Sequence, residues 1–209
     1  MHISCFRVAK AFPLSLLFCA GLMGCGDGVD SIEHARRAYL GLDKSVEKSL
    51  QLGFAGFNAA TSANIPAQSG TGDATGTLTI SGQVDQGSSA NKGMRLRVGM
   101  VNYSDGKLTV PGEDDTVELT YGTATDPTAQ PELTLSLRDI PNGSFTGQLL
   151  GKFQMSGDLE GEVTLDLVMN GRLEDDGTGK VRRVAGTTSI GGLATSSEGS
   201  YVVSISGNP

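Results

Sequence analysis

Residues 94–100 read Met-Arg-Leu-Arg-Val-Gly-Met, and this alternation of apolar and polar side chains decides the fold class. A period of two places the apolar side chains on one face of a β-strand and the polar ones on the other. The same period returns in later segments, at 117–121, 133–137, 145–155, 163–173 and 201–205. Turn-forming pairs such as Asp105-Gly106 and Asn142-Gly143 separate these segments. Short connections between successive strands predict antiparallel neighbours.

Glycines recur inside the predicted strands, at Gly99, Gly147, Gly151, Gly171, Gly186 and Gly191. Glycine weakens a flat sheet and is better used where a sheet bends strongly. We therefore predict a mainly β fold over residues 76–207, a strongly curved antiparallel meander forming a barrel or half-barrel of about eight or nine strands. A two-sheet β-sandwich is the alternative. The concave core is predicted to hold Met94, Leu96, Val98, Leu165, Leu167 and Met169.

Residues 31–53 carry a helical pattern instead, with apolar residues three and four positions apart. These residues are Ile32, Ala35, Tyr39, Leu42, Val46 and Leu50. Asp30 with Glu33 suggests an N-terminal cap, and Gly53 suggests a stop. We predict one amphipathic helix that covers the open end or concave face of the sheet and docks through Tyr39, Leu42 and Val46. Its opposite face is predicted to be solvated, with Arg36, Arg37, Lys44, Glu47 and Lys48.

Residues 54–75 lie between this helix and the β domain, and from Asn58 they are small, polar and aperiodic. Such a composition is typical of a flexible linker. We therefore predict a polar linker over 54–75.

The N-terminus has the pattern of an export signal. Arg7 and Lys10 precede an apolar run over residues 11–22, which at about a dozen residues is too short to span a bilayer. The run closes with Leu22-Met23-Gly24-Cys25, which resembles the lipobox of bacterial lipoproteins over the first 25 residues. An ordinary secretory signal, with Cys25 a bystander, is the alternative.

The lipoprotein resemblance implies a signal peptide over 1–24, a lipidated tether over 25–30 and acyl chains such as palmitate on Cys25. The partner it implies is a membrane, reached through the covalent lipid. Gly26 follows Cys25 where an Asp would signal inner-membrane retention in Gram-negative systems. We therefore expect a cell-envelope location, at the outer membrane if the host is Gram-negative.

Charge and composition exclude several classes of function. Removal of residues 1–24 deletes two basic residues and no acid, so the net charge changes from −7 to −9. An acidic surface repels phosphate backbones, which argues against a nucleic-acid partner. The chain has no Trp and only 7 Phe and 4 Tyr, too few flat rings for a carbohydrate- or base-stacking surface.

Candidate catalytic residues are scarce, and we predict no catalytic site and no cofactor. Beyond the signal, His34 is the only histidine and Cys25 is the only thiol, so neither a Ser/His triad nor a zinc site has its parts. Glycosidase chemistry needs two carboxylates in one cleft. The strand and turn acids that we considered for it are predicted to lie on solvated faces or at turns. They are Glu118, Glu132, Glu160, Glu162 and Asp166.

Three acid-rich loops, at 112–115, 158–160 and 174–180, carry oxygen ligands that calcium prefers, but none has the spacing of a dedicated calcium loop. We interpret them as solvated hairpin ends and predict no metal site. The Gly/Ser-rich segment 83–93 connects two predicted strands and is interpreted as a hairpin loop, since no helix follows it to bind phosphate.

Two hypotheses of function remain. The first is a membrane-anchored envelope lipoprotein that acts as a non-enzymatic structural or interaction component. The second is a carrier or binding protein for an apolar ligand such as a lipid, with a cavity between the helix and the curved sheet. The order of helix and curved sheet is similar to that of envelope lipoprotein carriers, an analogy of architecture alone.

Overall fold

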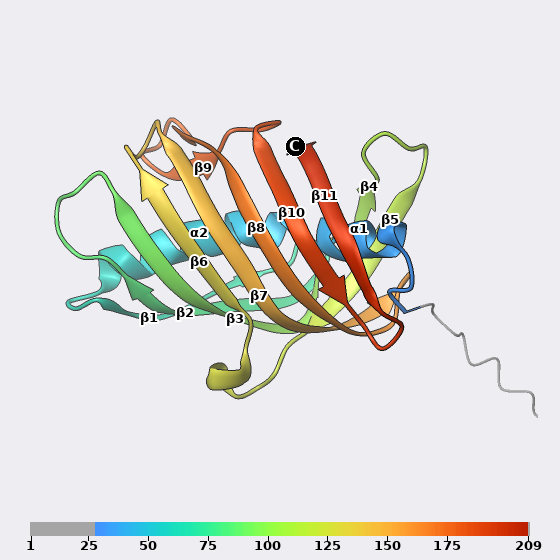
Figure 1. Ribbon diagram of the computed structural model, residues 1–209. Coiled ribbons are helices and arrows are strands. Elements are labelled where there is room, and N and C mark those ends of the chain that lie inside the picture. The colour runs from blue at the N-terminus through green and yellow to red at the C-terminus, as the bar shows by residue number, and fades with distance from the viewer. Residues whose placement is uncertain (1–27, 209) are drawn as a thin grey trace, which may run out of the picture.

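The computed structural model describes residues 28–208, which form one curved antiparallel sheet wrapped around two helices (Figure 1). The helices are α1 (Ile32–Leu40) and α2 (Asp43–Ala59), with a short 3₁₀ helix η1 (Pro127–Ala129). The strands are β1 (Asn64–Thr71), β2 (Thr75–Val84), β3 (Lys92–Ser104), β4 (Lys107–Thr109), β5 (Thr116–Gly122), β6 (Glu132–Arg138), β7 (Ser144–Gly157), β8 (Gly161–Asp175), β9 (Val181–Arg183), β10 (Thr188–Thr195) and β11 (Ser200–Asn208).

The strand order follows the chain almost without crossing. The path runs β1-β2-β3-β5-β7-β8-β10-β11, and β6 lies between β3 and β7 beside β5. Strand β7 pairs with β6 along one half and with β5 along the other, and β3 pairs with β6 over residues 92–97 and with β5 at Tyr103. Strands β1 and β11 are the two ends of the path, so the sheet is an open half-barrel.

The predicted mainly β, curved antiparallel fold is confirmed. The sandwich alternative is wrong, because all eleven strands belong to one sheet. The strand number exceeds the predicted eight or nine, because β4 and β9 have three residues each and β1 lies in the predicted linker. Three residues are too few to show a period.

The bend in β7 lies where the strand changes partner. Leu150 still pairs with β6, whereas Gln154 pairs with β5. Gly151 between them has φ +154°, and a Cβ there would lie 2.5 Å from Pro131 Cα. Only glycine allows both this backbone conformation and this close approach.

The predicted single helix is divided at Gly41 and Leu42. The Leu42 amide donates to Tyr39, three residues back, and the Tyr121 hydroxyl donates to the free carbonyl of Ala38 at 2.8 Å. A Cβ on Gly41 would lie 2.2 Å from the Tyr121 hydroxyl oxygen. The break is therefore made by a tyrosine from the sheet that takes over one helical acceptor.

Two details at the ends of this helical segment correct the predictions. Ser31, not Asp30, is the N-cap, and its hydroxyl accepts from the His34 amide. At the other end the predicted linker is ordered: residues 54–59 continue α2, and residues 64–71 form edge strand β1. Pro66 fits an edge strand because it has no N–H to donate.

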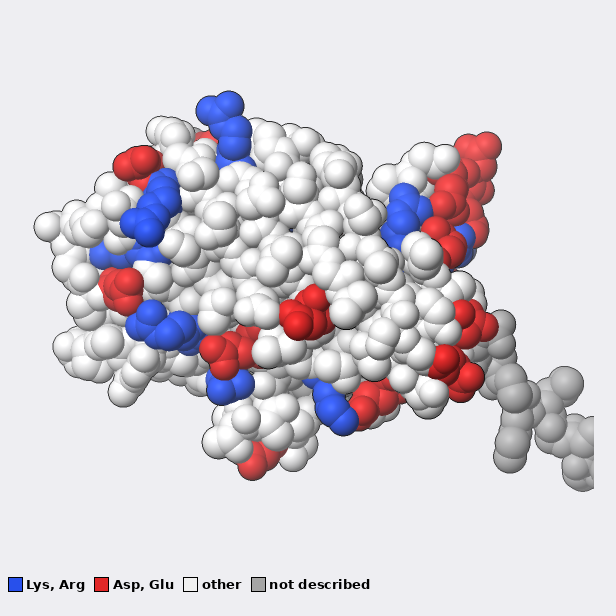
Figure 2. Space-filling model, in the orientation of Figure 1, with Lys and Arg blue, Asp and Glu red and all other residues white. Residues whose placement is uncertain are grey.

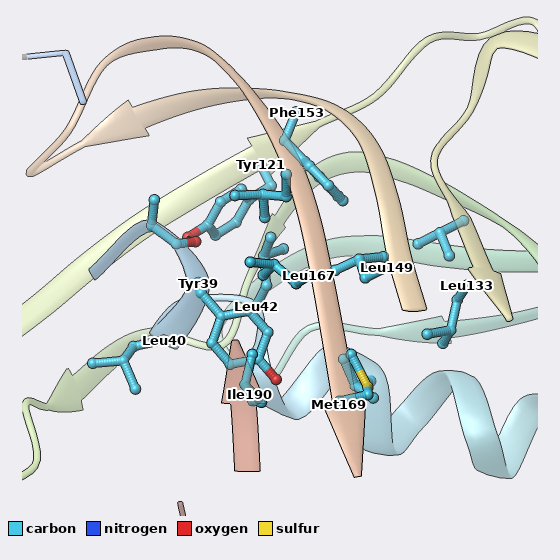
Figure 3. Close-up of a cluster of buried hydrophobic side chains, with 14 of the residues drawn as sticks. Tyr39, Leu40, Leu42, Tyr121, Leu133, Leu149, Phe153, Leu167, Met169 and Ile190 are labelled. Atoms are coloured by element: carbon cyan, nitrogen blue, oxygen red, sulfur yellow. The ribbon is translucent and has the colours of Figure 1, made fainter. Parts of the chain in front are cut away.

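The core fills the space between the helices and the concave face of the sheet (Figure 3). Tyr39 and Leu42 belong to one core cluster with side chains from β5, β6, β7, β8 and β10. Tyr121 packs edge-on against Phe153, with ring centroids 6.3 Å apart. The six predicted inward residues are 0–2% exposed. Side chains that lined a cavity large enough for water would keep solvent-accessible surface. These six residues keep almost none, so they pack into a solid core.

Candidate ligand groove at the mouth of the sheet

Helix α2 is held to the sheet at one side by a buried ion pair. The Arg183 guanidinium of β9 donates to both carboxylate oxygens of Asp43 at 3.1 Å and to Glu47 at 3.1 Å. The side chains of Arg183 and Asp43 are each 9% exposed. The Tyr39 hydroxyl donates to Asp43 at 2.7 Å. The pKa of Tyr39 is raised mainly by burial and then by the charge of Asp43.

A second cluster holds the other side of α2. Lys48 donates to Asp105, whose side chain is fully buried, and to Asp73 at 2.7 Å. The Tyr103 hydroxyl donates to the second oxygen of Asp105 at 2.7 Å. Hydrogen bonds from Lys48 and then Lys44 lower the pKa of Asp73. Helix α2 is therefore fixed on both flanks, which makes it a rigid wall.

Helix α1 is held by the first of the acid-rich loops. Arg36 donates to Glu113 at 2.7 Å, and Arg37 donates to Asp115 at 2.8 Å and to Glu33 at 2.8 Å. The loop is therefore not the plain solvated hairpin end that the sequence suggested. The predicted solvated helix face is correct for Lys44, which is exposed. It is wrong for the other four residues, which are partly buried and form ion pairs with loops of the sheet or, for Glu47, with Arg183 of β9.

An open groove of about 840 Å³ lies beside the C-terminal half of α2, at the mouth of the half-barrel. Its far side is formed by three loops at one end of the strands: β2–β3, β6–β7 and β8–β9. Apolar groups line much of it, from Leu52, Phe54, Phe57, Ala90, Ile140 and Val181. The groove lies outside the solid core, whereas the sequence hypothesis placed a cavity under the helix.

Lys92 is the unusual residue of this groove. It is the first residue of β3 and shares the inward face with Met94 and Leu96, and it is 6% exposed. Its ammonium donates to the Gly87 carbonyl at 2.5 Å and lies 4.8 Å from the Phe57 ring centroid. No carboxylate of the described chain forms an ion pair with it.

The β2–β3 hairpin loop was predicted correctly as a connection between antiparallel strands. The sequence analysis missed that this loop forms part of a groove. It also missed Lys92, although a signal was present: counting back by two from Met94 places a lysine at an inward position. Phe54 and Phe57 were missed because they fell in the predicted linker.

The other sequence candidates do not form a common site. His34 Nδ1 lies 2.8 Å from Asp30 at the start of α1, and His34 does not line the groove. Among the five considered carboxylates, Glu132 pairs with Arg97, Glu162 pairs with Lys152, and Asp166 accepts from Gln148. Neither these three nor Glu118 and Glu160 line the groove.

The remaining acid-rich loops use their carboxylates on the backbone. Asp158 accepts from the Glu118 amide at 2.8 Å. Asp175 accepts from the amides of Gly177 and Gly179, and Asp176 accepts from those of Thr178 and Lys180. Within residues 28–208, no group of three or more His, Cys, Asp and Glu side chains is placed to hold a metal ion.

The convex face carries a separate apolar feature over four strands. Leu193 on β10 pairs with Val202 on β11, and both are about half exposed, as are Leu150 on β7 and Val168 on β8. Figure 2 shows few charged side chains over β10 and β11. We call Leu150, Val168, Leu193 and Val202 the convex patch.

The predicted lipid site Cys25 and the signal peptide lie outside the described residues. In the described part of the chain, neither helix has the length and apolar character needed to cross a bilayer. A scan of protein-family models, a search of curated proteins and a search of solved structures each found no match to this chain.

Proposed function

We propose that the protein is a cell-envelope lipoprotein, anchored through a lipid on Cys25, that binds an apolar ligand in the groove beside α2. The observation that carries the proposal is the groove itself: about 840 Å³, open, lined largely by apolar groups and bordered by a few polar ones. Ligand pockets have volumes of roughly 300–1,000 Å³ and this kind of lining. The proposal needs no catalytic group.

The rigid setting of the groove supports this proposal. Helix α2 is fixed on one flank by Arg183 and on the other by Asp105 and Asp73. A preformed site loses less conformational entropy when a ligand binds.

The position of the groove also suits an anchored binding protein. Val29 is buried, and its carbonyl accepts from Ser196 at the β10–β11 turn. Thr164 of β8 pairs with Thr195 beside this turn, whereas Asp175 ends β8 next to the groove. The strand between them is about 36 Å long, at 3.3 Å per residue. An anchor at Cys25 would therefore lie nearer to the end of β8 that is opposite the groove.

Photo-crosslinking tests the proposal directly. The lipidated protein in nanodiscs would be irradiated with a diazirine analogue of oleyl alcohol, and labelled peptides mapped by mass spectrometry. We expect saturable labelling within 51–58, 88–92 and 139–141. Labelling that does not saturate, or that spreads over the convex face, would reject the groove as a ligand site.

A second candidate function is the interaction component, and the convex patch favours it. Leu193 and Val202 are direct cross-strand neighbours, and adjacent exposed apolar residues are typical of protein contact sites. If this function is the right one, Leu193→Glu should remove an envelope protein that crosslinks to the wild-type chain in cells. Unchanged crosslinking of every partner by Leu193→Glu would reject it.

A further inference from the structure

We infer that the groove selects an amphipath with an anionic headgroup, and that the Lys92 ammonium is the residue that recognises this headgroup. The inference rests on the proposed function, because it names the ligand class of the same groove.

The burial of Lys92 without a carboxylate is the first step. Lysine is almost never fully buried unless it is paired, because its charge loses hydration. Lys92 is 6% exposed, and its ammonium has three N–H donors. One donates to Gly87, and the Phe57 ring supplies a cation–π contact. Donor capacity is therefore left over beside the groove.

The acids near Lys92 already have other partners. Asp85 accepts from Arg95 at 3.1 Å and from the Gly93 amide at 2.9 Å. The other lysine on the α2 side, Lys48, is neutralised by Asp73 and Asp105. Lys92 and Lys180 are therefore the groove lysines without an ion-pair partner, and of the two only Lys92 is buried, whereas Lys180 is exposed at the rim.

The apolar lining determines the rest of the ligand. Phe57 and Phe54 lie three residues apart, about one helical turn, on the groove side of α2, and Ile140 lines the groove from the β6–β7 loop. These side chains are partly exposed in the groove although they pack on the core. A headgroup at Lys92 would thus continue into a hydrocarbon chain along α2. A free anion would leave this apolar surface uncovered.

Competition against the diazirine alcohol tests the headgroup. Oleate, oleyl alcohol and sodium acetate would each compete for labelling of the lipidated protein in nanodiscs, with the membrane-partitioned concentrations measured. A charge-assisted hydrogen bond at a desolvated site should give oleate at least about tenfold tighter binding than the alcohol. Acetate should not compete at the same concentrations.

Lys92→Met keeps the length of the side chain and removes its charge. This variant should therefore bind oleate and oleyl alcohol equally tightly, while the diazirine alcohol still labels it. Lys107→Met, at an exposed lysine of β4 that does not line the groove, is the matched control and should keep the preference. Equal binding of oleate and alcohol by the wild type, an unchanged preference in Lys92→Met, or competition by acetate would each overturn the inference. If the diazirine alcohol did not label the wild type at all, both the proposed function and this inference would be overturned.

Discussion

Gly41 shows how one residue decides the path of the helical segment. Alanine is favoured over glycine in a helix by about 1 kcal/mol, so propensity alone predicts that Gly41→Ala stabilises the protein. The Tyr121 hydroxyl oxygen would lie 2.2 Å from the new Cβ, which is a clash with a buried side chain. Overpacking of a core typically costs about 1–3 kcal/mol, so the clash should prevail.

We therefore predict that Gly41→Ala lowers the free energy of unfolding by up to about 2 kcal/mol in chemical denaturation. The same substitution in a Tyr121→Phe background should cost less or stabilise, because the clashing hydroxyl is gone. Equal effects of Gly41→Ala in both backgrounds would show that Tyr121 does not cause the break.

The residue scale also shows where the sequence was informative. The alternation of apolar and polar residues identified the six inward residues between Met94 and Met169, because a strand with one buried face has an apolar residue at every second position. Lys92 is a charged residue at an inward position of the same alternation, and it was overlooked. Its role can be inferred only when the groups around its ammonium are known. The Ser31 cap was misplaced by one residue, since Asp30 and Ser31 both suit the position.

At the scale of elements, ion pairs between α2 and the sheet were not predictable from sequence. Arg183 and Asp43 are 140 residues apart, and nothing local in either segment indicates the other. Strand β1 was missed for a related reason: it buries Ile65 alone, so its pairing with β2 depends on backbone hydrogen bonds that leave little trace in side chains.

Removal of the buried cation should damage the attachment of α2 strongly. We predict that Arg183→Met costs about 3–5 kcal/mol of unfolding free energy, because Asp43 would remain buried without its partner. The neighbouring Arg182 pairs with Glu174 at the surface, so Arg182→Met should cost at most about 1 kcal/mol. Similar losses in the two variants would contradict a special role of the buried pair.

The cluster at the other flank should make stability depend on pH. The pKa of Asp73 is lowered in the folded protein by Lys48 and Lys44, so its contribution is complete above its unfolded pKa of about 3.9. This contribution disappears as pH falls through the lower folded pKa.

We predict that Asp73→Asn lowers the melting temperature at pH 7 and that its difference from the wild type shrinks steadily below about pH 4. Asp114→Asn, at an exposed residue without a hydrogen bond or ion pair in the described structure, should follow the wild type at every pH. A constant difference between Asp73→Asn and wild type down to pH 2 would argue against the assigned role of Asp73.

At the scale of the whole molecule, the sequence indicated the architecture better than the site. A curved sheet with a helical segment on its concave face followed from periodicity and glycine positions. The groove did not, because it is bordered by three loops and a helix end that come together only through the curvature of the sheet.

The anchor remains a prediction from the first 25 residues. Acyl chains contribute about 0.8 kcal/mol per buried CH₂, so two or three of them make release from a bilayer negligible. Cys25→Ala should therefore leave the protein unprocessed or soluble in cell fractionation. A Cys25→Ala protein that matures and stays in the membrane as before would show that the lipobox interpretation is wrong.

The central claim, that the groove beside α2 holds an apolar ligand, is tested most directly by filling the groove. Ala55 is exposed and lines the groove, whereas Ala59 is exposed on the same helix and does not. The concentration of diazirine oleyl alcohol at half-maximal labelling would be measured for Ala55→Trp and Ala59→Trp in nanodiscs, alongside their melting temperatures. We predict equal melting temperatures, a rise of at least about tenfold in that concentration for Ala55→Trp, and no change for Ala59→Trp. If both tryptophan variants were half-labelled at the same probe concentration as the wild type, the claim would be contradicted.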